Sequence, residues 1–134
     1  GNVTVSGTTP ATSSYVDTRG FDALTIVCVN NTVTDAGTAS GFTITLQESA
    51  DTTDAAATTV ATADTVDGSN TVTVTSDSAD DAIAGGLGYN GNTRYVGITV
   101  TGTTGSDADI SIFAVQNKPH AAKTTFIGTA VSRT

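Results

Sequence analysis

The chain has 134 residues, of which only 13% are charged, and its formal net charge is −8. Residues 1–116 carry all 13 carboxylates and two cations, a net charge of −11, whereas residues 117–134 carry three cations and no carboxylate. Such an acidic body repels phosphate groups, which argues against nucleic-acid binding. No apolar stretch approaches the roughly 18 residues of a membrane-spanning helix, and a single cysteine excludes an intramolecular disulfide.

The residue composition favours β-structure. The chain contains no Trp and no Met, only four Phe and three Tyr, so Val, Ile, Ala and Thr must supply most of the core. β-branched residues pack well on a pleated sheet and lose rotamer freedom in a helix. Fourteen glycines, together with many Asn and Asp residues, supply turns. The length suits one domain, and we therefore expect a single all-β domain.

The N-terminal half contains four predicted strands, at residues 2–6, 14–17, 21–30 and 42–48. Residues 21–30 are the most apolar run, and we expect a central strand covered on both faces, with Cys28 as a buried and inert side chain. Residues 31–41 have the Thr, Gly and Asp composition of a connection. Residues 42–48 alternate apolar and polar side chains, which is typical of a strand with one buried face.

The C-terminal half continues the pattern with weaker signals. A loop with one optional helical turn is expected at 50–57, and a weak strand, with an edge position as one option, at 58–66. A strand at 70–75 and a long Asp- and Gly-rich loop at 76–92 follow. The last expected strands are at 92–101 and 109–116. After Asn117 the alternation ends.

Seven or eight short strands without a segment of helical periodicity predict an antiparallel β-sandwich, Ig-like or jelly-roll-like, with a small barrel as the main competitor. The predicted body covers residues 1–117, and residues 118–134 are expected to form an extended C-terminal arm that is no independent domain. The side chains expected to face the core are Phe42, Ile44, Leu46, Val72, Val74, Val96, Ile98, Val100, Ile110 and Ile112.

The residue patterns indicate no catalytic or cofactor site. Residues 86–91 have the GxGxxG spacing, but the dinucleotide motif needs a strand before it and a helix after it, and here a polar loop and a strand are expected. The clustered aspartates do not follow a calcium-loop pattern and are expected to be solvated turn residues. The single histidine, His120, has no nucleophile tied to it by a motif. We predict a protein without enzymatic activity, cofactor or metal.

Three blocks of the sequence carry a resemblance to a known family. They are VDTRGFDAL at 16–24, FTITLQES at 42–49 and NTRYVGITV at 92–100, and the likeness ends at VQNKP, residues 115–119. In this order they resemble small structural proteins of tailed bacteriophages. The resemblance implies a β-sandwich component of the virion, in particular a head decoration (cement) protein on the outer surface of the head.

The resemblance also implies partners. These are the major capsid protein of the same particle and further copies of the chain, with a trimer favoured because cement proteins often occupy local three-fold axes. The expected mechanism is noncovalent clamping of neighbouring capsid subunits, which stabilises the assembled state by mass action. Two alternatives stay open: a tail, neck or fibre-base component, and an Ig-like adhesin or carbohydrate-binding domain. A cleft lined by Tyr15, Tyr89 and Tyr95 would favour the last of these.

The basic residues divide into two sets. Arg19 and Arg94 lie in the acidic body and are expected to form structural ion pairs, with Asp17, Asp22 and Glu48 as candidate partners. The C-terminal arm is expected to bind a partner or a neighbouring subunit through Lys118, His120, Lys123, Phe126, Ile127 and Arg133. A frayed terminus is one alternative, and anchoring by residues 1–10 is another.

Overall fold

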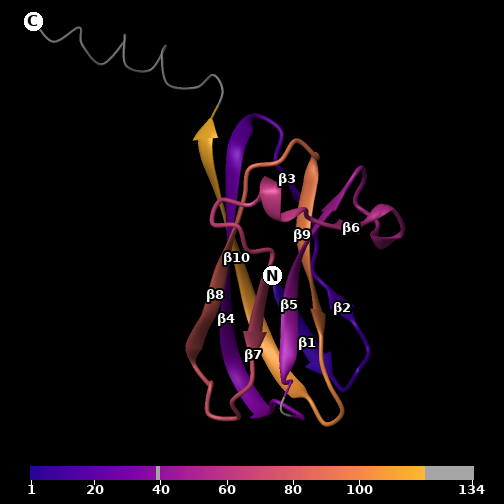
Figure 1. The fold of residues 1–134 in the computed structure, drawn as a ribbon, viewed down its shortest axis with the longest axis vertical. Helices are drawn as coiled ribbons and strands as arrows, with labels where there is room; N and C mark the ends of the chain where they lie inside the picture. The colour runs from indigo at the N-terminus through magenta and orange to yellow at the C-terminus, as the bar shows by residue number, and fades with distance from the viewer. Residues whose placement is uncertain (39, 120–134) are drawn as a thin grey trace, which may run out of the picture.

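The computed structural model describes residues 1–38 and 40–119. In this part of the chain, two antiparallel β-sheets pack face to face (Figure 1), which confirms the predicted β-sandwich. Helical structure within the described residues is limited to two short 3-10 turns, η1 (Asp54–Ala56) and η2 (Thr62–Asp64).

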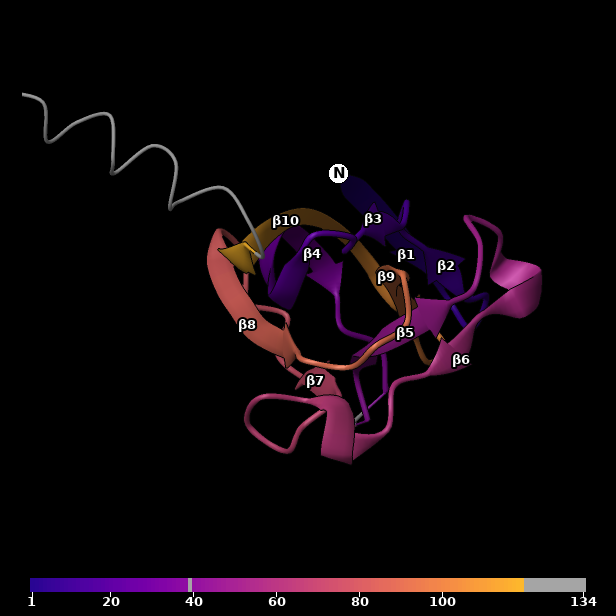
Figure 2. The same cartoon turned by 90° about the horizontal axis from the view of Figure 1, so that it is seen from above.

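The first sheet has four strands in the order β1-β10-β4-β8, which are Asn2–Ser6, Asp107–Pro119, Phe21–Asp35 and Ala82–Tyr89. The second sheet has the order β2-β9-β5-β6, which are Ala11–Thr12, Tyr95–Thr101, Phe42–Ser49 and Thr58–Thr59. Two further strands join it, β3 (Val16–Asp17) beside β9 and β7 (Thr71–Val74) beside β5. Seen along the strands, β8, β4 and β10 lie on one side of the core and β9, β5 and β6 on the other (Figure 2).

The core lies between the two sheets and is built from alternate strand positions. Phe42, Ile44 and Leu46 of β5 are fully buried, as predicted. Nine of the ten side chains expected to face the core are buried, and the tenth, Val72, packs against the core while partly exposed. Cys28 is fully buried as well, and burial raises the pKa of its thiol to about 11, in agreement with the expected inert role.

The prediction of a long loop over residues 76–92 is wrong, because residues 82–89 form strand β8. The glycines of this segment leave room for neighbouring side chains. A Cβ atom on Gly85 would lie 2.7 Å from Val72, and one on Gly88 would lie 2.8 Å from Val66. Gly86 and Gly88 of the GxGxxG spacing therefore lie in strand β8, and Gly91 lies in the loop after it. The spacing lacks the strand–turn–helix context of a dinucleotide site.

Several predicted boundaries also change. Strand β4 continues through residues 31–35, which were expected to be a connection, and β10 extends to Pro119. Only Thr58–Thr59 of the weak strand predicted at 58–66 forms a strand. The expectation that residues 21–30 are covered on both faces is wrong. Ile26 is buried against the second sheet, but Val27 on the opposite face is partly exposed, because no layer of the described chain covers that face.

Gly41, which precedes β5, lies where the backbone leaves no space for a side chain. Its φ is +63°, and a Cβ atom there would overlap the backbone carbonyl of Val74. Gly7 has a similar φ of +59° with nothing within 4 Å of a Cβ position. Gly7→Ala should lower the free energy of unfolding by about 1–2 kcal/mol, the cost of placing an L-residue in the left-handed conformation. Gly41→Ala should lower it by more, because the overlap with Val74 adds to this cost. Urea denaturation measures both, and equal losses would contradict the overlap.

Candidate interaction surfaces

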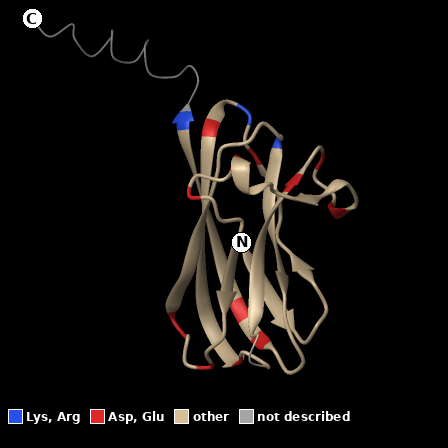
Figure 3. Cartoon of the chain, in the orientation of Figure 1, with Lys and Arg blue, Asp and Glu red and all other residues tan. Residues whose placement is uncertain are grey.

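The three described cations lie at one end of the sandwich, called here the cationic end (Figure 3). Arg19 lies in the turn before β4, Arg94 directly precedes β9, and Lys118 is exposed near the end of β10. The strand register joins these positions, because Pro119 pairs with Phe21 and Asp17 pairs with Tyr95. The opposite end of the described body carries aspartates and no cation; they are Asp35, Asp77, Asp80, Asp81 and Asp107.

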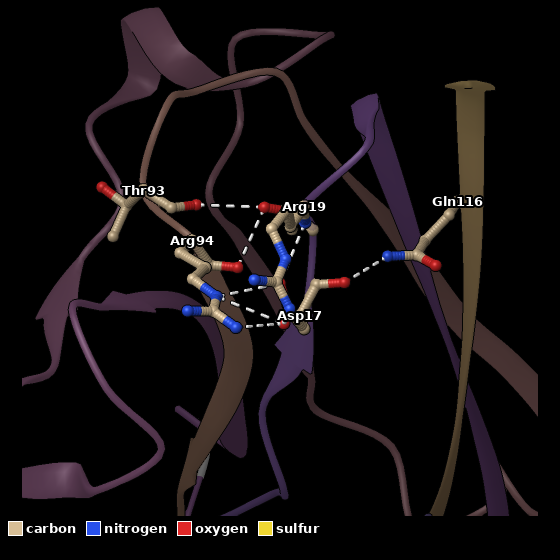
Figure 4. Close-up of polar contacts among 6 residues, drawn as sticks. Asp17, Arg19, Thr93, Arg94 and Gln116 are labelled. Atoms are coloured by element: carbon tan, nitrogen blue, oxygen red, sulfur yellow. Dashed lines mark hydrogen bonds and ion pairs between the residues drawn. The ribbon is translucent and has the colours of Figure 1, made fainter. Parts of the chain in front are cut away.

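Asp17 holds both arginines (Figure 4). Nη2 of Arg94 lies 2.7 Å from Oδ2 of Asp17, and Nε of Arg94 lies 3.2 Å from each carboxylate oxygen. Nη2 of Arg19 lies 3.5 Å from Oδ2, and the Arg19 backbone N–H donates to Oδ1 at 3.0 Å. The Arg94 guanidinium also lies over the ring of Tyr95, 4.7 Å from its centroid. The two predicted ion pairs therefore share one carboxylate.

Hydrogen bonds from side chains to backbone carbonyls join three distant segments around Asp17. The Thr18 hydroxyl donates to the carbonyl oxygens of Thr93 at 3.2 Å and Arg94 at 2.9 Å. The side-chain amide of Gln116 in β10 donates to the Asp17 carbonyl at 2.5 Å. The sequence blocks at 16–24 and 92–100 thus meet in space, and their Asp, Thr and Arg residues have a structural role at the cationic end.

A shallow cleft of about 590 Å³ opens beside this cluster, lined by residues 18–22, 90–92 and Arg94. Its lining contains no tyrosine. Tyr89 is buried, the ring of Tyr95 lies beneath Arg94, and Tyr15 lines a separate hollow of about 190 Å³. The three tyrosines do not form one cleft, so the arrangement that would favour carbohydrate binding is not present.

Tyr89 binds the loop that carries Arg94 through its hydroxyl group. The Tyr89 hydroxyl donates to Oε2 of Glu48 at 2.9 Å and accepts the Thr93 N–H at 2.8 Å. Burial raises the pKa of Tyr89 to about 12. Gly91 makes room for this hydroxyl, since a Cβ atom there would lie 2.6 Å from it. Glu48, a candidate partner of the arginines, therefore accepts a hydrogen bond from a tyrosine.

Tyr89→Phe removes the hydroxyl and leaves the Thr93 N–H without this partner. Because an intramolecular hydrogen bond contributes about 0.5–1.5 kcal/mol and the Thr93 bond is only partly buried, we expect a loss of this size in the free energy of unfolding. Glu48→Gln keeps an acceptor for the hydroxyl and is the matched control, with a smaller expected loss. Thermal or urea unfolding of both variants measures the difference, and a neutral Tyr89→Phe would show that the network does not support the loop.

The Asp17 cluster predicts a pH dependence. Hydrogen bonding to Arg94, followed by the Arg19 backbone N–H, lowers the pKa of Asp17 to about 2 from its ordinary value of 3.8. A lowered folded-state pKa means that the cluster contributes stability above about pH 4 and loses this contribution as the pH falls toward 2. The stability difference between wild type and Asp17→Asn should therefore be full at neutral pH, small near pH 2 and absent below it.

Urea unfolding across this pH range checks the prediction. Arg94→Gln removes the main partner and should give the same pH profile, and the double variant should lose less than the sum of the two single losses. A wild-type to Asp17→Asn difference that is independent of pH would contradict the role of the carboxylate charge.

The outer face of the four-stranded sheet carries a second candidate surface. Phe113 and Val115 of β10 are 58% and 51% exposed, and Ile83 of β8 is 72% exposed. The register pairs Phe113 with Val27 and Ile83 with Val29. These five side chains form an apolar stripe across β10, β4 and β8. Contiguous exposed apolar surface marks interaction sites on soluble proteins.

The same face becomes polar toward β1. The Asp109 carboxylate accepts hydrogen bonds from the Asn31 amide at 3.1 Å, the Asn2 amide at 2.6 Å and the Thr4 hydroxyl at 3.2 Å. The Asn31 bond, ahead of the other two, holds the pKa of Asp109 below its ordinary value. The apolar stripe therefore has a polar border on one side.

Sequence reasoning found the two arginines and Lys118 but missed the apolar stripe. The residues Ile112 to Val115 are apolar at both strand parities, and in an antiparallel sheet with one covered face this pattern leaves apolar side chains outside. That signal was present in the sequence. The other predicted arm residues, His120, Lys123, Phe126, Ile127 and Arg133, lie outside the described residues.

Within residues 1–38 and 40–119, no group of three or more His, Cys, Asp or Glu side chains is placed to hold a metal ion. The same residues include no helix with the length and apolar character needed to cross a membrane. Comparisons with protein-family models, curated proteins and solved structures find no match for this chain. The candidate surfaces of the described body are the cationic end, with its cleft, and the apolar stripe.

Proposed function

We propose that this chain is a structural protein of a virus particle, a head decoration (cement) protein without enzymatic activity that clamps neighbouring subunits of the major capsid protein. The observation that carries the proposal is the apolar stripe, which places Phe113, Val115 and Ile83 in solvent on a rigid sheet. Burying such a side chain against a partner contributes about 1.5–3 kcal/mol. An otherwise polar and acidic module has reason to expose these residues when another protein covers them.

The distribution of charge supports one orientation on the shell. Residues 1–119 carry three cations and 13 carboxylates, a net charge of −10, and all three cations lie at the cationic end. The stripe and the cationic end would face the capsid, and the aspartate-rich end would face solvent. Polar contacts at the cationic end would set orientation and association rate, while apolar burial would supply most of the affinity.

Clamping follows from selective binding. A protein that binds the assembled shell and not the separated subunits stabilises the shell by about 2.7 kcal/mol per site when its free concentration is 100 times Kd. Many copies at symmetry-related sites add this contribution over the whole head. No covalent chemistry is needed for such a role.

Cryo-electron microscopy of particles from the source that encodes this chain tests the proposal. We expect copies at symmetry-related positions on the outer head surface, with the apolar stripe against the shell. Absence of the chain from the particle, or its presence on the tail or neck alone, would overturn the proposal.

A binding experiment tests the surface itself. Ile83→Lys should weaken co-sedimentation of the chain with particles that lack it by roughly tenfold or more, about 1.4 kcal/mol, because it places a charge in an apolar contact. Thr73→Lys is the matched control, since Thr73 is exposed on β7 in the other sheet, and it should bind like wild type. Equal binding by both variants would exclude the stripe as the contact.

A further inference from the structure

Strand β10 has two neighbouring strands along its first half and one along its second half. β1 pairs with residues 107–111 of β10, and Gly1 exchanges two backbone hydrogen bonds with Ile112, at 2.8 and 2.9 Å. On the other side, β4 continues to pair with β10 as far as Pro119. Beyond Ile112, none of the described strands occupies the β1 side of β10. We call this side of residues 113–119 the open edge.

The open edge presents unpaired backbone groups. Ile112 turns both its N–H and its C=O toward Gly1, and these directions alternate along a strand. The backbone N–H and C=O groups of Ala114 and Gln116 therefore point toward the open side. An edge of this kind is a template on which an extended segment can add as a further strand.

Apolar side chains lie on both faces beside the open edge. Phe113 and Val115 stand on the outer face. On the inner side lies the hollow of about 190 Å³, whose lining includes Ile112, Ala114 and Val16. Successive side chains of a strand point to opposite faces, so a segment that adds here needs apolar residues at neighbouring positions.

The C-terminal residues 120–134 have this pattern. Phe126 and Ile127 are adjacent, so that in an extended strand one would cover Phe113 and Val115 and the other would enter the hollow. The segment carries Lys123 and Arg133 and no carboxylate, whereas residues 1–119 carry a net charge of −10. Opposite net charges attract the segment to the body of another copy. Because the cationic end lies beside residues 117–119, the apolar contacts and the backbone pairing would decide where on that body it binds.

We infer that the open edge of β10 receives residues 120–134 of a second copy as an added strand, which makes the chain an arm-exchanged homo-oligomer. The shortest hairpin back onto β10 within one copy would turn directly after Pro119, and residues 119–123 contain none of the Gly, Asn or Asp residues that two-residue turns use. This composition favours a second copy as the donor of the strand. Fifteen extended residues span up to about 50 Å, which is enough to reach a neighbour. The inference does not depend on attachment to a particle.

The mass in solution gives the first test. Light scattering after size exclusion should give a multiple of 13.3 kDa for the full chain. The chain without residues 120–134 should have the mass of one shortened copy. Phe126→Ser with Ile127→Ser should behave like the deletion, and both changes lie outside residues 1–119. A monomeric full chain, or an oligomer that survives the deletion, would overturn the inference.

Variants of the acceptor strand locate the contact. Val115→Ser should raise the dissociation constant of the oligomer by roughly tenfold or more. Ile83→Ser is the matched control for mass, because Ile83 is also apolar and exposed on the outer face but lies on β8, two strands away from β10. Equal effects of the two variants on mass would contradict a contact at the open edge. Ala114→Pro, which removes an N–H on the open side, should also give monomers.

A mixing experiment decides which copy supplies the strand. Chains with Ala114→Cys are mixed with chains carrying either Phe126→Cys or Ile127→Cys, oxidised, and run on a non-reducing gel. One of the two arm variants should form disulfide-linked heterodimers and the other should not, because adjacent strand residues point to opposite faces. Cys28 is buried and protonated at neutral pH, so it should not compete. Failure of both arm variants to form heterodimers would overturn the inference. A chain that carries Ala114→Cys together with an arm cysteine tests pairing within one copy, and a cross-link found only within that chain would also overturn the inference.

Discussion

The pairing of β10 with β4 is the constraint on which the rest of the structure depends. These two long strands run antiparallel from the pair Asp107–Asp35 to the pair Pro119–Phe21. Their register turns Ile112 and Cys28 into the core and Phe113 and Val27 outward. A slip of one residue would exchange the two faces, placing the apolar stripe inside and core residues in solvent. The same register brings the end of β10 beside the turn that carries Arg19, which creates the cationic end.

The charge distribution along the sandwich follows from the hydrogen bonds and ion pairs that charged side chains form at its two ends. At the aspartate-rich end, Asp80 accepts the Val33 N–H and Asp77 accepts the Ala36 N–H, the latter at 2.8 Å. These carboxylates bind backbone donors that the sheet leaves unpaired, as Asx turns do. At the other end, Asp17 is neutralised by two guanidinium groups. Local hydrogen bonding thus accounts for the position of several charges, and an acidic end opposite a cationic end is the result on the scale of the molecule.

The four-stranded sheet offers two surfaces that share Phe113 and Val115. The apolar stripe is part of a sheet face, and its Ile83 and Val29 lie toward β8, away from the open edge of β10. An edge receives a strand in the plane of the sheet, whereas a face receives a partner perpendicular to it. With the arm in place, its apolar residue over Phe113 and Val115 would become part of the outer face presented to the shell, next to Val27, Val29 and Ile83. Copies linked edge to strand would present their outer faces together, which would raise the effective concentration of each face for a shell.

Local patterns in the sequence were sufficient to predict the all-β class, strands such as 2–6 and 42–48, and a core that includes Ile44 and Leu46, because alternation is set by neighbouring residues. Tertiary structure alone decided other features. The glycine-rich residues 82–89 became a strand because β4 pairs with them and Val72 packs over them. Arg94 binds Asp17, 77 residues away in the chain, because β3 pairs with β9. The exposed outer face and the open edge depend on how many layers and neighbours surround a strand, and this is determined by contacts between residues far apart in the chain.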